Sequence, residues 1–184
     1  MGADEEYMAN WREIDFRYDW ISLTLSALKS GFASIRRMGE DVPWFDGLWQ
    51  MEHAESIFGM AFIAAQAYIL GTAGDLNKIR LSNGKGELKK GTYYSDDLVY
   101  LKNGVSRISL INEIANYYKH HDEWNGWPKR ETTEVLAKVG IDESTEFPCY
   151  EAAKQLWDED ESENLENLLS IISAWREHVL SKHQ

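Results

Sequence analysis

The densest group of residues able to do chemistry lies in residues 113–123. Glu113, Asn116 and His120 are separated by three, four and seven positions, so they share one face if this segment is helical. A histidine titrates near neutral pH and can act as a general base. Asn116 could fix its tautomer, and Lys119 could hold a phosphate. The alternative is an ordinary polar helix flank, and the residues alone leave both interpretations open.

Metal-ligand residue types occur in the same region and earlier in the chain, at Glu52, His53 and Glu55. Helical bundles that hold two metal ions use Glu-x-x-His on facing helices, and this spacing is absent from the sequence. Adjacent residues such as His120 and His121 point in different directions on a helix. We therefore expect no metal and no cofactor. Glu52, His53 and Glu113 are kept as binding neighbours of the cluster.

Other catalytic signatures are missing: there is no P-loop, dinucleotide-binding glycine motif, Gly-x-Ser-x-Gly or Cys-x-x-Cys. The one cysteine, Cys149, has no basic neighbour in sequence and is expected to be a buried structural residue. A lone cysteine suits a reducing compartment. Residues 1–10 do not read as a signal peptide, and the apolar run 57–70 is shorter than the ~18 residues of a membrane span. These observations favour a cytoplasmic protein without a membrane partner.

Residues 115–120, Ala-Asn-Tyr-Tyr-Lys-His, resemble the signature of HEPN domains (higher eukaryote and prokaryote nucleotide-binding domains). That signature is an arginine, often followed by Asn, Asp or His, with a histidine four to six residues after the arginine. Residues 55–70 also resemble the central helix of uncharacterised bacterial helical-bundle proteins. The resemblance implies a four- or five-helix bundle in a defence or toxin–antitoxin setting, which binds RNA, a nucleotide or a protein partner and often forms a homodimer.

Many HEPN proteins are metal-independent ribonucleases. Whether the resemblance extends to this activity depends on which residues of the signature are present in this sequence. Asn116 and His120 carry over, but Ala115 stands at the arginine position. In the family the arginine is read as holding the scissile phosphate, and alanine cannot stabilise that charge. The resemblance therefore implies a non-catalytic or weakly catalytic binder. The alternative is a metal-independent ribonuclease with His120 as acid and base and Lys119 as phosphate contact.

A second segment, Arg176 to His183, has an arginine and a histidine with six residues between them, but it ends one residue before the C-terminus. Helix ends fray there, so we interpret this match as coincidence. Trp124 and Trp127 follow the histidine cluster directly. They could wall a pocket and stack a base, or they could cap the bundle, which we favour.

The hydrophobic pattern predicts an all-α, up-and-down bundle of four to six helices in a single domain, residues 1–184. Gly39 is expected to stop the first helix, and Gly71 and Gly74 are expected to end or kink the second. Residues 82–104 are predicted to be a long loop, and residues 125–163 short helices with an acidic segment. The expected helices are 9–38, 45–70 with a continuation over 75–79, 105–121, 132–139, 149–157 and 163–181.

The net charge of −12 argues against a protein that simply coats nucleic acid or anionic lipid. Residues 78–107 invert this charge with seven basic and three acidic residues, which indicates a solvated loop or a phosphate-binding arm. Residues 142–166 hold ten acids and one lysine. This acidic stretch either keeps the protein soluble or docks a basic partner, and the second reading predicts an interaction or inhibitor protein of a different class.

Overall fold

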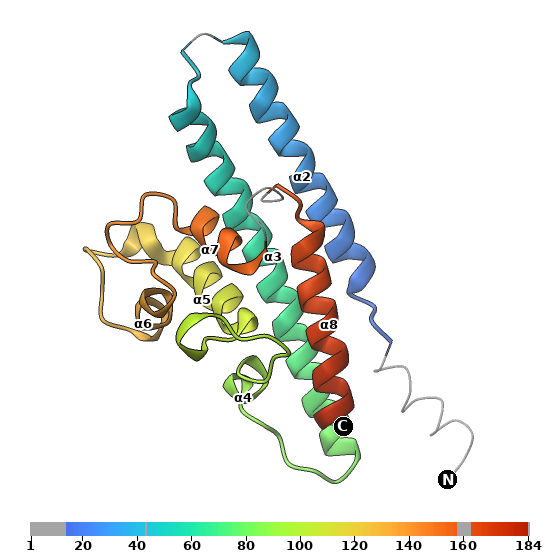
Figure 1. Ribbon diagram of the computed structural model, residues 1–184. Helices are drawn as coiled ribbons and strands as arrows, with labels where there is room; N and C mark the ends of the chain where they lie inside the picture. Colours follow the sequence, from blue (N-terminus) through green and yellow to red (C-terminus); the bar gives the residue numbers. More distant parts are fainter. Residues whose placement is uncertain (1–13, 43, 158–162, 184) are drawn as a thin grey trace.

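The computed structural model describes residues 14–42, 44–157 and 163–183, and it contains no β-strand in these ranges. The expected all-α helical bundle is confirmed (Figure 1). Its helices are α2 (Tyr18–Asp41), α3 (Gly47–Ser82), α4 (Lys90–Tyr94), α5 (Arg107–His120), α6 (Glu131–Lys138), α7 (Pro148–Leu156) and α8 (Glu166–His183), with 3₁₀ turns η2 (Lys102–Gly104) and η3 (His121–Glu123).

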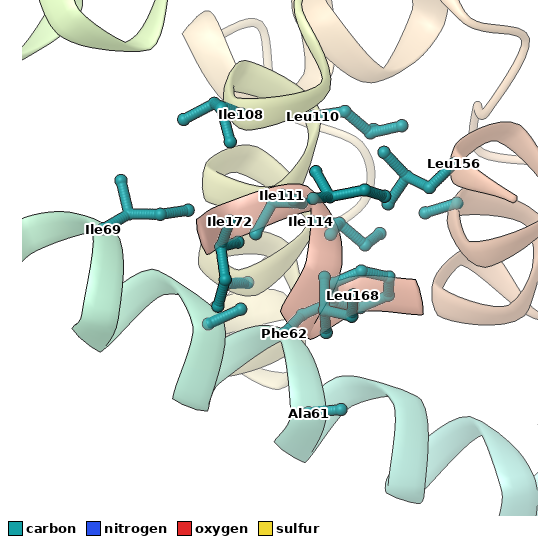
Figure 2. Packing of buried hydrophobic residues seen from close by; sticks show 14 of the residues in the cluster. Ala61, Phe62, Ile69, Ile108, Leu110, Ile111, Ile114, Leu156, Leu168 and Ile172 are labelled. Carbon is teal, nitrogen blue, oxygen red and sulfur yellow. The ribbon is translucent and has the colours of Figure 1, made fainter. Parts of the chain in front are cut away.

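Helix α3 is the centre of the bundle and contacts α2, α4, α5, α7 and α8. Its middle is apolar on every side, as expected of a helix that is covered all round. Phe62 and Ile69 are fully buried, and Figure 2 shows them facing isoleucines of α5 and residues of α8. Gly59 lets α5 approach closely, because a Cβ at this position would collide with the ring of Tyr118.

The second predicted helix is longer than expected: α3 passes Gly71 and Gly74 without interruption and ends at Ser82. Its apolar face continues beyond the glycines through the buried residues Leu76 and Ile79, so burial outweighs the low helix propensity of glycine. Gly71 also has a packing role, since a Cβ there would collide with the side chain of Arg17.

The first helix also differs from the prediction. It runs from Tyr18 through Gly39 to Asp41, and the expected residues 9–13 lie outside the described part of the chain. Tyr18 and Trp20 are exposed, and the buried stripe begins at Ile21.

The predicted long loop contains the short helix α4, which the sequence pattern did not indicate. The ring of Tyr93 is buried, and its backbone oxygen accepts a hydrogen bond from Trp175 Nε1 at 3.1 Å. A buried aromatic ring and this bond to α8 therefore anchor α4 to the bundle.

By length and composition alone, α3 is apolar enough to cross a membrane. In the structure, 56% of its most apolar 18-residue window is buried by the other helices. The core helix of a helical bundle can have the same composition, because most of its apolar surface packs against neighbouring helices.

Truncating the centre of α3 should destabilise the fold strongly. Phe62→Ala is expected to lower the free energy of unfolding by about 3–5 kcal/mol, because it removes a fully buried ring and leaves a cavity in its place. Met60→Ala on the same helix is the control, since Met60 is half exposed, and should change stability by less than about 1 kcal/mol. Urea denaturation measures both, and equal effects would contradict this packing.

Candidate functional site

The candidate site on α5 is a hydrogen-bond network that joins α5 to α3 through Gln66. Gln66 is buried, and its Nε2 donates to the backbone oxygen of Asn112 at 3.1 Å, to Asn112 Oδ1 at 2.9 Å and to Asn116 Oδ1 at 2.8 Å. The Lys119 ammonium donates to Gln66 Oε1 at 2.7 Å. Both ends of the Gln66 amide are therefore satisfied by α5, two of the contacts coming from the predicted residues Asn116 and Lys119.

Glu113 extends this network toward α6. Its carboxylate accepts from Asn112 Nδ2 at 2.6 Å, Asn116 Nδ2 at 3.2 Å and Thr132 Oγ1 at 2.7 Å. Glu113 and Thr132 are both buried. A buried carboxylate needs several donors to offset the loss of hydration, and these three supply them. The network thus uses its polar groups to hold three helices together.

His120 shares a helix with these residues but not their network. Its side chain is 49% exposed, and Nδ1 lies 3.5 Å from Glu123 Oε2. At the arginine position of the resembled signature, Ala115 is fully buried in the core. The structure therefore joins Glu113, Asn116 and Lys119 and leaves His120 at the surface.

Trp124 and Trp127 pack against the end of α5. Their rings are 6.2 Å apart, and each lies within 6 Å of the Tyr117 ring, at 5.6 and 5.8 Å. The Arg130 guanidinium sits 4.7 Å above the Trp124 ring. Rings that contact one another in this way cover the helix end, which agrees with a capping role.

Glu52 and His53 do not join the α5 cluster. Both are exposed, and they precede Gln66 by about 20 Å along α3, given a rise of roughly 1.5 Å per residue. The His53 ring instead packs on Phe45 at 5.1 Å, and its Nδ1 lies 2.8 Å from the backbone oxygen of Trp49. These two residues lie in the first turns of α3, next to its connection with α2.

Glu55, one turn further along α3, has a structural role that the sequence did not reveal. Its carboxylate accepts from the backbone N–H groups of Cys149 and Tyr150 at 2.7 and 2.9 Å, and so caps the start of α7. The residue at the N-cap position of α7, Phe147, has no side chain that could do this. Cys149 is fully buried, as predicted, and burial raises the pKa of its thiol well above the usual value.

The second arginine–histidine match does not form one site. Arg176 is buried, with Nε 3.7 Å from Asp15 Oδ2, whereas His183 Nε2 lies 2.6 Å from Asp96 Oδ2. Burial alone would raise the pKa of Asp96, but hydrogen bonds from Lys182, His178 and His183 hold it far below its usual range. The cluster pins the chain after α4 to the end of α8.

The acidic stretch 142–166 is partly used within the chain. Glu163 pairs with Arg36, and Glu166 lies 3.0 Å from Lys29 Nζ, so its end docks on basic residues of α2. Asp158, Glu159, Asp160 and Glu161 lie outside the described residues. Within the described ranges, no group of three or more His, Cys, Asp or Glu side chains is placed to hold a metal ion.

The sequence matches no protein-family model, and no curated protein or solved structure is significantly similar to it.

Glu55 should make stability depend on pH. Burial raises the pKa of its carboxyl above 4.5, and the capping N–H groups and His121 oppose this without cancelling it. Above pH 4.5 the folded chain therefore keeps a proton that the unfolded chain has lost, and stability falls as pH rises through this window. The side chain at this position does not titrate in Glu55→Gln, so the variant lacks this pH-dependent contribution to stability.

The stability advantage of the wild type over Glu55→Gln should therefore be larger at pH 4 than at pH 7, measured by urea denaturation. Glu52→Gln, an exposed carboxylate on the same helix, controls for the removal of charge. An advantage that grows with pH would contradict the direction of the shift.

Proposed function

We propose that this chain works by binding a partner and not by cleaving a substrate, as a HEPN-like helical bundle with a degenerate motif. The observation that carries the proposal is the use of Asn116 and Lys119 in the network around Gln66. Asn116 is half-buried and Lys119 is exposed, and both join α5 to α3 through part-buried hydrogen bonds, so withdrawing either side chain would break a contact between the two helices. Asn116 and Lys119 are therefore poorly placed to move with the phosphate group of a substrate during a reaction.

The absence of an arginine at the signature position, where Ala115 stands, supports the same proposal. Cleavage of a phosphodiester without a metal needs a positive charge beside the developing negative charge. Ala115 is fully buried in the core. Even an arginine at this position would extend from buried backbone and not from the surface. His120 is accessible for proton transfer, but Glu123 is the charged group beside it.

A protein partner is favoured over RNA or a nucleotide. The chain carries a net charge of −12, which opposes contact with phosphates. It also exposes the large rings of Trp44 and Trp49, at 67% and 45%. Exposed aromatic side chains that lie together are typical of protein interfaces. A cytoplasmic defence or toxin–antitoxin setting follows from the resemblance and is part of the proposal.

The test is a cleavage assay on a mixed RNA pool in EDTA, with wild type and His120→Ala. We expect no cleavage above the buffer control by either protein. His120→Ala should also remain folded, because this side chain is half exposed. Metal-independent cleavage by the wild type that His120→Ala abolishes would overturn the proposal and establish the ribonuclease alternative.

A further inference from the structure

The connection between α2 and α3 carries an exposed apolar surface. We call residues 38–42 and 44–53 the acidic tip. Figure 1 shows this end of the two helices standing clear of the rest of the bundle. Accordingly, no residue of α3 before Phe58 is buried. Four large apolar side chains of the acidic tip are exposed, at 41–67%: Met38, Trp44, Leu48 and Trp49.

The acidic tip also has a charge of one sign. Its sequence contains four carboxylates and no lysine or arginine; the carboxylates are Glu40, Asp41, Asp46 and Glu52. The nearest cations are directed elsewhere: Arg36 pairs with Glu163, and Arg37 donates to Ala33 O and Ser34 Oγ at 3.3 Å. The acidic tip therefore combines exposed aromatic rings with a net negative charge.

The opposite end of α3 has the complementary charge. We call residues 78–90 the basic end. It contains five basic residues and one acid, a net charge of +4. Lys89 and Lys90 are exposed and form no ion pair in the described part of the chain, and Leu81 is 53% exposed. Lys78 pairs with Asp75, which lies just outside the basic end, at 3.5 Å. The basic end thus offers two unpaired ammonium groups and an exposed apolar side chain.

We infer that the acidic tip of one copy docks on the basic end of a second copy, head to tail. The two surfaces lie at opposite ends of a 36-residue helix, about 50 Å apart at roughly 1.5 Å per residue, so one chain cannot join them itself. Tip-to-tip pairing would place four carboxylates against four. Opposite charges favour the head-to-tail encounter, and burial of Trp44 and Leu48 stabilises it.

This inference rests on the proposed binding function and names a partner for it. A head-to-tail contact leaves one free surface at each end of every dimer, so it propagates into open chains. In sedimentation velocity, the mean mass of the wild type should therefore rise above 21.3 kDa with protein concentration. It should fall again when salt screens the charges.

Two double variants test the acidic tip and the basic end independently. Trp44→Ala with Leu48→Ala disables the tip, and both side chains are at least half exposed. Lys89→Glu with Lys90→Glu disables the basic end and places acids at the start of α4, where the helix dipole favours them. Each variant alone should stay at 21.3 kDa. Mixed one to one, they should form a dimer of twice this mass, because one intact tip meets one intact basic end.

The control is Leu23→Ala, which removes a 72% exposed side chain from α2 and should associate like the wild type. Far-UV circular dichroism checks that every variant is folded. A wild type that stays monomeric at all concentrations would overturn the inference. So would a mixture that stays monomeric, or a Lys89→Glu/Lys90→Glu variant that still associates. The RNA assay is independent of these outcomes, so failure of self-association leaves the proposed function to be judged separately.

Discussion

The buried amide of Gln66 is the polar exception in the middle of an apolar helix, and the position of α5 depends on it. A buried amide must find hydrogen-bond partners for both its oxygen and its nitrogen. Gln66 finds them on one neighbouring helix, from Asn112, Asn116 and Lys119. Sliding α5 along α3 by one turn would break these bonds together. The network therefore fixes the register in which the apolar faces of the two helices meet.

This constraint changes how the polar residues on α5 are interpreted. Read along the sequence, Glu113, Asn116, Lys119 and His120 form one cluster that resembles a catalytic motif. In the folded chain the first three are bound to one another or to Gln66 and Thr132, and His120 lies outside. These hydrogen bonds give Glu113, Asn116 and Lys119 a structural role, and our proposal is that this role is their main one. Exposed apolar and charged side chains that take no part in this network lie at the two ends of α3.

Periodicity in the sequence was enough to predict the helical bundle and the helical nature of α5. It could not predict features that depend on contacts between distant segments. The capping of α7 by Glu55 joins residues 94 and 95 positions apart, and α4 is held by a bond to Trp175 across 82 positions. Gly71 and Gly74 were expected to break the helix because the packing of Gly71 against Arg17, and the burial of Leu76 and Ile79 beyond both glycines, depend on distant segments. Trp49 is exposed because it lies on α3 before Phe58, the first residue of this helix that is buried.

The central claim is that Asn116 serves to join α5 to α3. A double-mutant cycle on Gln66→Ala and Asn116→Ala, measured by urea denaturation, tests it most directly. Gln66 Nε2 donates to Asn116 Oδ1 at 2.8 Å, so the two changes should be coupled by about 1 kcal/mol. Additive effects, with a coupling near zero, would contradict the claim and return Asn116 to the list of residues free to act in a site.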